Sequence, residues 1–469
     1  MRIVITGATG LIGRALARRL VHAGHQVVAL SRDPAAAAHR LPARCQIAAW
    51  APATGTVASD VLRGTDAVIH LAGEGVADRR WTPRRKQAIR DSRVETTRAL
   101  VHALASLPTA ERPPTFVGAS AIGIYGERGD EPLDELSPGG SGFLADVCRQ
   151  WELATLAASD LGLRTVVVRI GVVLGREGGA LAHLLPVFRL GLGARLGTGR
   201  QWMSWIHLDD VVGLLSHAAT HPGVAGVVNA VAPAPVRNTD FTRQLATAVH
   251  RPTALRLPAA VVRLLLGESA TVVLSSQRVL PAAAESLGFH FAFPHLETAL
   301  DDLCADPAHE VVYEQWLPRT PEVVFPFFAD AYNLEQITPP FLRFRVRGLS
   351  TPAVEAGTYI DYRLRLHGIP LRWQSRIDQW EPNHTFVDFQ TRGPYALWHH
   401  THVFTPADGG TVMRDRVRYR LPLGALGDLV AGARVARDVD AIFRYRWETI
   451  AQHFRPTGAS TAPVGAPAA

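Results

Sequence analysis

Short runs of β-branched residues alternate with longer helical stretches over the first three hundred residues. The pattern predicts strands at residues 3–6, 27–30, 67–71, 116–119 and 165–169, and helices at 11–23, 83–106 and 143–161. Such alternation is typical of a parallel sheet covered by helices on both faces. After Asn229 the chain is rich in Pro and Ala and returns to helical spacing near Val261. We therefore expect a smaller C-terminal lobe packed on the sheet.

The pattern changes at residues 304–310, which we interpret as a linker. Beyond it, alternating apolar and polar positions predict strands at 311–317, 343–347, 359–366, 372–380, 385–390, 399–404 and 411–421. A long amphipathic helix is expected from Ala425 to Phe454. Antiparallel strands followed by one long helix predict an α+β domain over 311–455, in which the sheet grips the helix. Residues 456–469, small and Pro-rich, are expected to form a disordered tail.

A glycine-rich turn joins the first strand to the first helix. Residues 6–13 read Thr-Gly-Ala-Thr-Gly-Leu-Ile-Gly. Gly7 permits a tight turn, Gly10 lets the backbone approach a pyrophosphate, and Gly13 lets the helix pack closely on the strand. Strand, triplet and helix in this order predict a dinucleotide-binding, Rossmann-type, doubly wound parallel sheet. Within the loop, the cofactor-binding residues that we expect are Gly7, Thr9, Gly10, Leu11, Ile12 and Gly13.

The end of the second predicted strand indicates which dinucleotide is bound. Ser31 stands where a cofactor without a 2′-phosphate calls for Asp or Glu, and Arg32 follows it. A guanidinium can pair with a 2′-phosphate, so we predict NADP(H) over NAD(H). The alternative, that Arg32 is a solvated surface residue, stays open.

Composition limits both the mechanism and the partners. The chain has 469 residues and 49 Lys and Arg, of which only Lys86 is a lysine, so a phosphate-loop NTPase is excluded. The net charge of +7 is spread thinly, without a basic stripe, and we expect no nucleic-acid partner. The three cysteines lack metal or redox spacing. We expect no leader and no membrane insertion, hence a cytoplasmic protein, and the sequence leaves a homodimer open.

Further motifs carry a family resemblance. They are the glycine loop, His70-Leu-Ala-Gly73, Ser120 with Tyr125-Gly126, Arg169-Ile-Gly-Val172 and Trp205-Ile-His-Leu-Asp-Asp210. Together they resemble the extended short-chain dehydrogenase/reductase superfamily of nucleotide-sugar epimerases. Other motifs resemble an atypical epimerase-like branch with an extra C-terminal segment, here about residues 240–303: Arg79-Arg80-Trp81, Ser92-Arg93, Trp151-Glu152 and Gln201-Trp-Met-Ser-Trp205. The resemblance covers residues 1–303 and implies an NADP-binding epimerase-like domain.

That resemblance also implies where the cofactor and the chemistry lie. Adenosine and ribose would contact Leu71, Ala72 and Gly73, while the nicotinamide would approach Ala119, Ser120, Ile170, Gly171 and Val172. Members that transfer hydride use a Tyr-x-x-x-Lys pair, whose lysine lowers the tyrosine pKa. Here Phe143 and Val147 occupy those places, and no tyrosine precedes a lysine by four residues. The standard proton-transfer dyad is therefore missing.

Two catalytic candidates are left. Ser120 could hold a substrate carbonyl and Tyr125 could supply a proton, although a loop-packing role fits Tyr125 better. Other proton sources that stay open are Glu74, Asp146 and Cys148, the last also readable as a small buried thiol. His207 and Asp210 are expected to fix a loop and not to perform chemistry.

Residues 310–455 resemble the SRPBCC (START-like, helix-grip) superfamily of lipid-transfer, polyketide-cyclase and plant-allergen proteins, in which a curved sheet wraps a long helix around a cavity. The matching residues include Pro321-Glu-Val-Val-Phe325, Thr338-Pro-Pro340 and Trp398-His-His-Thr-His402. His400 and His402 share a strand face and could ligate a metal, but no third ligand follows at a diagnostic spacing, so we expect none. We expect Trp373, Trp398, His400 and His402 to line an apolar ligand cavity. That they form core and cross-strand pairs stays open.

Two hypotheses for function follow. The first is an NADP(H)-dependent epimerase-like or oxidoreductase-like protein without the usual dyad, whose appended domain binds a hydrophobic small molecule. The second is a cofactor-binding regulatory or cell-division-related protein without turnover. The missing dyad favours the second, while the intact glycine loop with Ser120 keeps the first open.

Overall fold

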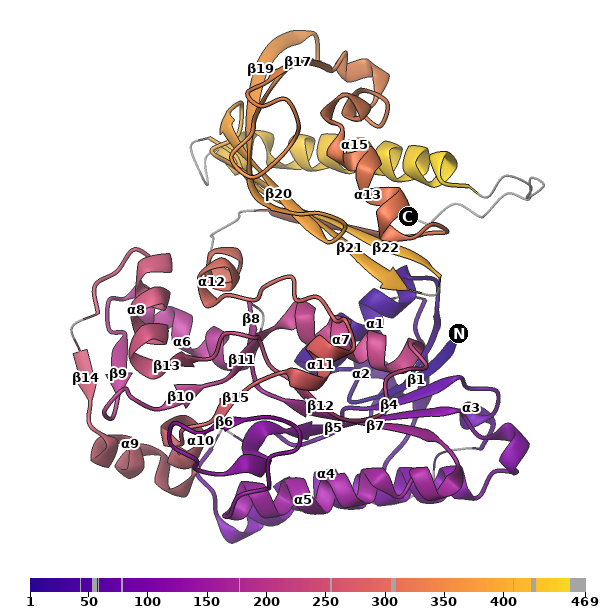
Figure 1. Ribbon diagram of the computed structural model, residues 1–469, viewed down its shortest axis with the longest axis vertical. Helices are drawn as coiled ribbons and strands as arrows, with labels where there is room; N and C mark the ends of the chain where they lie inside the picture. The colour runs from indigo at the N-terminus through magenta and orange to yellow at the C-terminus, as the bar shows by residue number, and fades with distance from the viewer. Residues whose placement is uncertain are drawn as a thin grey trace. The chain divides into compact units, whose positions relative to one another are not determined.

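The computed structural model describes residues 1–42, 44–52, 57, 59–76, 79–176, 178–253, 255–304, 309–407, 409–422 and 427–455. The chain forms two compact units, Met1–Ala305 and Asp306–Ala469, each with its own large sheet (Figure 1). Most of the predicted linker, residues 305–308, and the predicted tail, 456–469, lie outside the described residues. Within the described ranges, every helix is too short or too polar to cross a membrane.

Unit 1 is built on a parallel seven-stranded sheet of order β12-β7-β5-β4-β1-β2-β3. Its strands are β1 (Arg2–Thr6), β2 (Gln26–Ser31), β3 (Gln46–Ala49), β4 (Ala67–His70), β5 (Thr115–Ala121), β7 (Arg164–Ile170) and β12 (Gly226–Ala230). The strand order reverses at β1, and such a switch point opens a crevice outside the carboxyl ends of the strands. The hydrophobic pattern did not predict β3, a four-residue strand without a fully buried side chain.

Helices cover both faces of this sheet (Figure 1). On one face lie α1 (Leu11–His22) and α7 (Leu208–Thr220), whose Leu16 and Leu215 are fully buried in the core. On the other lie α4 (Pro83–Ala105) and α5 (Phe143–Leu156), with Leu100 and Leu104 buried. Each such leucine contributes about 1.5–3 kcal/mol of hydrophobic stabilisation. The helix predicted at 143–161 ends early, and a separate 3₁₀ turn spans Ser159–Leu161.

The rest of unit 1 consists of short elements. Near β2 and β3 lie α2 (Pro34–Ala38) and α3 (Ser59–Leu62). Four two-stranded ladders join β8 (Val172–Gly175) to β11 (Trp205–His207), β9 (Ala194–Leu196) to β14 (Leu255–Leu257), β10 (Trp202–Met203) to β13 (Val236–Arg237), and β6 (Pro132–Leu133) to β15 (Arg278–Val279). The helices of this part are α6 (Gly179–Arg189), α8 (Asn238–Ala248), α9 (Ala259–Leu266), α10 (Thr271–Leu274), α11 (Ala282–Ser286) and α12 (Leu296–Cys304).

The buried pair at the start of α7 has a structural role. The Asp210 carboxylate accepts hydrogen bonds from the backbone amides of Ala292 and Phe293 at 2.7 and 3.0 Å. The His207 ring stacks on Phe293 with centroids 3.9 Å apart. These contacts hold the segment before α12, so the expectation that His207 and Asp210 fix a loop is confirmed.

Unit 2 carries an antiparallel seven-stranded sheet of order β16-β22-β21-β20-β19-β18-β17. The strands are β16 (His309–Leu317), β17 (Arg345–Leu349), β18 (Tyr359–Leu366), β19 (Ile369–Glu381), β20 (Thr385–Arg392), β21 (Leu397–Ala407) and β22 (Gly410–Arg420). After α13 (Pro321–Ala329) and the strands, a π-helical turn (Asp428–Gly432) leads into the long helix α15 (Ala433–His453).

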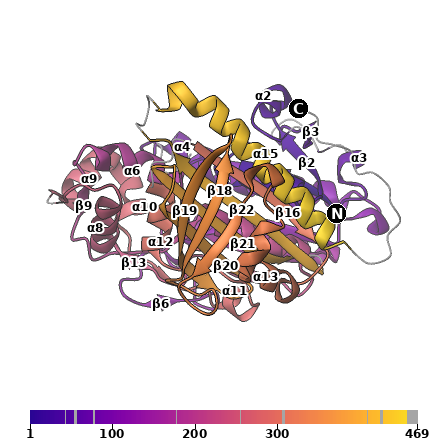
Figure 2. The same ribbon diagram turned by 90° about the horizontal axis from the view of Figure 1, so that it is seen from above.

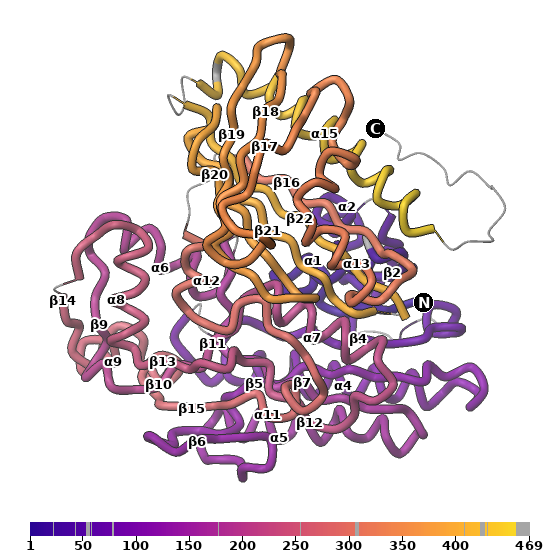
Figure 3. The backbone as a smooth tube through the Cα atoms, turned by 45° about the horizontal axis from the view of Figure 1, so that its top comes forward, coloured from indigo at the N-terminus to yellow at the C-terminus, as the bar shows by residue number. Residues whose placement is uncertain are grey.

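Helix α15 lies across one face of this sheet (Figures 2 and 3). Its Val439 and Phe443 are buried against Trp398 and Tyr419, and Ile450 is buried near α13. Both halves of the predicted fold class are confirmed: a doubly wound parallel sheet in unit 1 and a helix-grip α+β arrangement in unit 2.

Candidate functional site

The loop after β1 has the backbone geometry that its glycines predict. Gly7 has φ of +68°, and a Cβ there would lie 2.7 Å from the backbone carbonyl carbon of Leu71. A Cβ on Gly13 would overlap the carbonyl oxygen of Gly7. Gly10 precedes α1 without a side-chain cap, so amides of the first helical turn are left for an anion. The loop therefore excludes side chains where a phosphate would approach.

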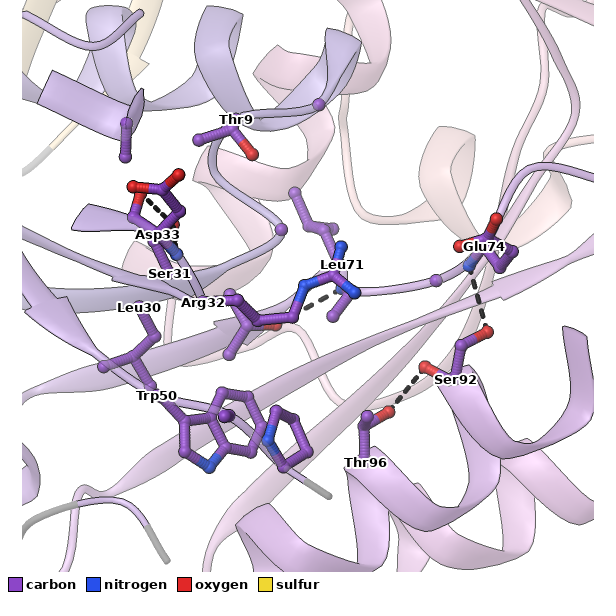
Figure 4. Close-up of a pocket in the computed structure, with 18 of the residues that line it drawn as sticks. Thr9, Leu30, Ser31, Arg32, Asp33, Trp50, Leu71, Glu74, Ser92 and Thr96 are labelled. Carbon is purple, nitrogen blue, oxygen red and sulfur yellow. Dashed lines mark hydrogen bonds between the residues drawn. The ribbon is translucent and has the colours of Figure 1, made fainter. Parts of the chain in front are cut away.

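A pocket of about 630 Å³ opens beside this loop, at the carboxyl ends of β1, β2 and β4 (Figure 4). Its lining includes the predicted cofactor residues Gly7, Thr9, Gly10, Arg32, Leu71, Ala72 and Gly73. The other predicted cofactor residues lie outside that lining, in α1, in β5 and where β7 leads into β8: Leu11, Ile12, Gly13, Ala119, Ile170, Gly171 and Val172. The pocket thus brings together the half of the set that would hold adenosine, ribose and pyrophosphate.

The end of β2 presents a cation and no available carboxylate. The Ser31 hydroxyl donates to the backbone carbonyl of Asp33 at 3.0 Å. The Asp33 carboxylate accepts from the Ala36 amide at 2.9 Å and caps α2, so it serves the helix. Arg32 is exposed and pairs with no acid among the described residues. Arg40 also lines the pocket, which sequence reasoning missed because no motif distinguishes it.

Helix α4 supplies the facing wall of the pocket. Ser92, Glu95 and Thr96 line it, and the Ser92 hydroxyl accepts from the Glu74 amide at 3.0 Å (Figure 4). Sequence reasoning used Ser92 for the family resemblance and missed the other two. Their signal was helical spacing, since positions three and four apart share a helix face.

Ser120 and Tyr125 belong to one buried network at the ends of β5 and β7. The Ser120 hydroxyl donates to Glu152 Oε1 at 2.6 Å. Arg169 pairs with both oxygens of Glu152 at 2.9 Å and donates to the Tyr125 hydroxyl at 2.9 Å. That hydroxyl also lies 2.8 Å from Asn229 Oδ1. Burial raises the pKa of Tyr125, and the ring is fully buried. This placement favours the loop-packing role of Tyr125.

The place of the missing dyad is apolar. Phe143 begins α5 and packs edge-on against Trp81 with centroids 5.0 Å apart, while Val147 is buried. The only lysine lies close by, with Lys86 Nζ 5.1 Å from the centre of the Phe143 ring. Lys86 also pairs with Glu268 Oε1 at 2.6 Å. The lysine therefore contacts the phenyl ring of Phe143, which cannot donate or accept a proton as a tyrosine would.

The remaining proton-source candidates have other partners. Burial raises the pKa of the Cys148 thiol to about 11, so it stays protonated near neutral pH. Glu74 pairs with Arg85 at 2.6 Å, and Asp146 pairs with Arg149 at 2.7 Å. Their contacts fit structural roles.

In unit 2, the four predicted cavity residues separate into two groups. Trp373 and Trp398 meet edge to face with centroids 5.1 Å apart and pack with Tyr395 beneath α15. His400 and His402 instead face two carboxylates. Their ring centroids lie 3.8 Å apart.

The two histidines and two aspartates form what we call the His/Asp ring: Asp388, His400, Asp415 and His402. Asp388 Oδ2 lies 3.2 Å from His400 Nδ1 and 3.4 Å from His402 Nε2. Asp415 Oδ1 lies 3.4 Å from His400 Nε2 and 2.6 Å from His402 Nδ1. Burial by itself would raise the pKa of Asp388, but the hydrogen bonds and charges of the two histidines hold it below its ordinary value. The pKa of His402 is lowered by burial and by His400. Sequence reasoning used Asp415 only for the family resemblance and missed Asp388; the two come from strands on either side of β21.

Comparisons with known proteins place these sites in a family context. Residues 3–230 match the NAD dependent epimerase/dehydratase family, 257–303 a domain of unknown function, and 308–455 the family described as polyketide cyclase/dehydrase and lipid transport. The order confirms the architecture expected from the motifs.

Individual relatives match unit 1. The chloroplastic epimerase family protein SDR39U1 homolog of Arabidopsis thaliana is 41% identical over 300 residues, 64% of this chain and 86% of that protein. The crystal structure of human epimerase family protein SDR39U1 (isoform 2) with NADPH aligns with a TM-score of 0.58 and 36% identity, over 65% of this chain and all of that one. A nucleoside-diphosphate sugar epimerase from Corynebacterium glutamicum aligns with a TM-score of 0.53 and 36% identity, over 65% of this chain and 59% of that one. The chain belongs to the NAD dependent epimerase/dehydratase family, on the branch that includes the SDR39U1 proteins.

Proposed function

We propose that unit 1 binds NADP(H) in the pocket at the ends of β1, β2 and β4. The observation that carries the proposal is Arg32, an exposed cation in the lining, beside Ser31 in the place of a ribose-binding acid. Pyrophosphate would lie at the start of α1, where Gly7 and Gly10 leave room for it. Arg32 would pair with the 2′-phosphate. The NADPH in the crystal structure of human SDR39U1 supports this choice.

Titration calorimetry with NADPH and NADH tests the proposal. Arg32→Glu should weaken NADPH binding by about 10–100-fold, the loss of a charge-assisted pair, and leave NADH binding nearly unchanged. Arg243→Glu is the matched control, because Arg243 is an exposed arginine of α8 outside the pocket lining. An equal loss of both cofactors in Arg32→Glu would contradict the assignment to a 2′-phosphate.

For chemistry, we propose an epimerase-like or oxidoreductase-like protein that does not use the usual tyrosine and lysine. NADPH supplies a hydride when bound, but Phe143 and Val147 provide no acid or base beside it. Ser120 is the residue we propose to orient a substrate carbonyl, on condition that its hydroxyl leaves Glu152 when substrate binds. Its present bond to a buried carboxylate supports the second candidate, a cofactor-binding regulator without turnover.

Turnover separates these two functions. Carbonyl compounds and nucleotide sugars are mixed with NADPH, and the absorbance of the reduced nicotinamide is followed. Oxidation that Ser120→Ala abolishes while NADPH still binds supports the enzyme. Binding of NADPH without oxidation of any substrate supports the regulator.

We propose that unit 2 binds a hydrophobic small molecule between its sheet and α15. The match of residues 308–455 to polyketide cyclase/dehydrase and lipid transport proteins supports this, as do Trp373, Trp398 and Tyr395 beneath α15. Native mass spectrometry of the whole chain should reveal a co-purified small molecule that Trp398→Ala releases. A chain of unliganded mass in every preparation would contradict it.

A further inference from the structure

Three side chains from two neighbouring strands of unit 2 converge on one point. Asp388 comes from β20, and His400 and His402 come from β21. One ligand atom from each lies within 4.8 Å of the other two. Sheet register produces this convergence, because Asp388 pairs directly with His400, and His402 lies two residues further along the same face.

The distances between these atoms suit a shared cation. Ligands bound at about 2.0–2.1 Å around a tetrahedral ion lie about 3.3 Å from one another. Asp388 Oδ2 lies 3.2 and 3.4 Å from the two ring nitrogens. A direct N–H···O hydrogen bond prefers about 2.9 Å. The distances from Asp388 Oδ2 to the two ring nitrogens therefore match the distance between two ligand atoms of a tetrahedral metal site better than the length of a hydrogen bond.

The groups behind the three side chains would hold them in place. Asp415 Oδ1 faces the other nitrogen of both rings, at 3.4 and 2.6 Å, as carboxylates do behind metal-bound histidines. Arg446 Nε lies 3.4 Å from the second oxygen of Asp415. The Ser375 hydroxyl, 3.3 Å from Asp388 Oδ1, keeps the other oxygen of Asp388 toward the rings.

The two sides of the His/Asp ring differ in accessibility. His400 Nε2, His402 Nδ1 and Asp415 Oδ1 face one another on the side away from Asp388 and are buried there. The Asp388 side chain is 18% exposed, whereas those of His400 and His402 are 5% and 2% exposed. A cation therefore has a route to the site from the Asp388 side.

We propose that Asp388, His400 and His402 bind a divalent transition-metal ion of the Zn²⁺ or Fe²⁺ class, with Asp415 orienting both rings. Two imidazoles and one carboxylate suit these ions, whereas Mg²⁺ and Ca²⁺ prefer oxygen ligands. Three protein ligands leave a coordination position for water or a bound molecule. The site lies in unit 2 and does not depend on the NADP(H) proposal. It also revises the expectation of no metal, because the third ligand comes from the adjacent strand.

Co²⁺ is the probe that tests the site. The whole chain, without a polyhistidine tag, is stripped with a chelator and titrated with Co²⁺ while visible d–d absorption is recorded. We expect saturation at a single ion per chain, displacement by Zn²⁺ and no displacement by equimolar Mg²⁺. Asp415→Asn should weaken Co²⁺ binding by about 10–100-fold, and His400→Gln should weaken it more.

The matched control is His399→Gln, the same substitution one residue away on the opposite face of β21. It should bind Co²⁺ as the wild type does. Circular dichroism checks the fold, and Asp388→Asn, partly exposed and nearly isosteric, replaces His400→Gln if that variant does not fold. A wild type without saturable d–d absorption would overturn the proposal, as would a folded His400→Gln or Asp388→Asn variant that binds like His399→Gln.

Discussion

Two buried ionic networks, one in each unit, differ in how completely their polar atoms are bonded. In unit 1, Glu152 and Arg169 form a bidentate pair at 2.9 Å. Every buried side-chain polar atom of that pair, and of Ser120 and Tyr125, has a hydrogen-bond partner. In the His/Asp ring of unit 2, His400 Nε2, His402 Nδ1 and Asp415 Oδ1 face one another as ion pairs without a well-directed hydrogen bond. A closed network mainly stabilises the fold, whereas the less complete one contains the residues that we propose to bind a metal ion.

The largest expected effect comes from breaking each network at its arginine. Arg169→Ala should lower the free energy of unfolding by about 3–5 kcal/mol, because it leaves the Glu152 carboxylate buried without a positive charge beside it. Arg446→Ala should cost less, because Asp415 keeps both histidine rings as partners, at 3.4 and 2.6 Å, when the arginine is removed. Native-state hydrogen exchange of β5 and β22, read by mass spectrometry, measures each unit separately. Equal losses in both units would remove the distinction.

A third buried histidine sharpens the comparison, because its partners are neutral. His70 Nδ1 lies 2.6 Å from the Thr6 hydroxyl and Nε2 lies 2.9 Å from that of Thr97. Burial lowers the pKa of His70 to about 4, from 6.5. The unfolded chain therefore binds the proton first as the pH falls, so stability present above pH 6.5 is lost progressively toward pH 4.

At pH 5 this loss amounts to about 2 kcal/mol relative to pH 7. Urea unfolding of the wild type and of His70→Asn at both pH values measures it. The substituted side chain carries no charge at either pH, so His70→Asn should lack this part of the pH dependence of unfolding. The variant should also be less stable than the wild type at pH 7. An identical pH dependence in both proteins would show that His70 is not the group that titrates.

The dinucleotide pocket was readable from the sequence where its parts are local. Gly7, Gly10 and Gly13 act through the backbone within one turn, so their spacing alone predicts the loop. Strand alternation likewise predicts that His400 and His402 share a face. Asp388 was not predictable, because it reaches His400 through the register of β20 and β21, which a sequence pattern does not specify. The contact of Lys86 with Phe143 joins two helices and was missed for the same reason.

The smallest expected effect tests whether the closed network has a chemical role. Tyr125→Phe removes one hydroxyl that lies 2.8 Å from Asn229 Oδ1 and accepts from Arg169. Since neutral hydrogen bonds contribute about 0.5–1.5 kcal/mol, and an unbonded partner adds to the cost, we expect a loss of about 1–2 kcal/mol in unit 1. NADPH affinity, measured by calorimetry, should not change, because Tyr125 is fully buried and lies outside the pocket lining. If Tyr125 instead supplied a proton, the variant would show the same loss of stability and would also lose turnover while still binding NADPH, so turnover measured on the same preparation separates a packing residue from a catalytic one.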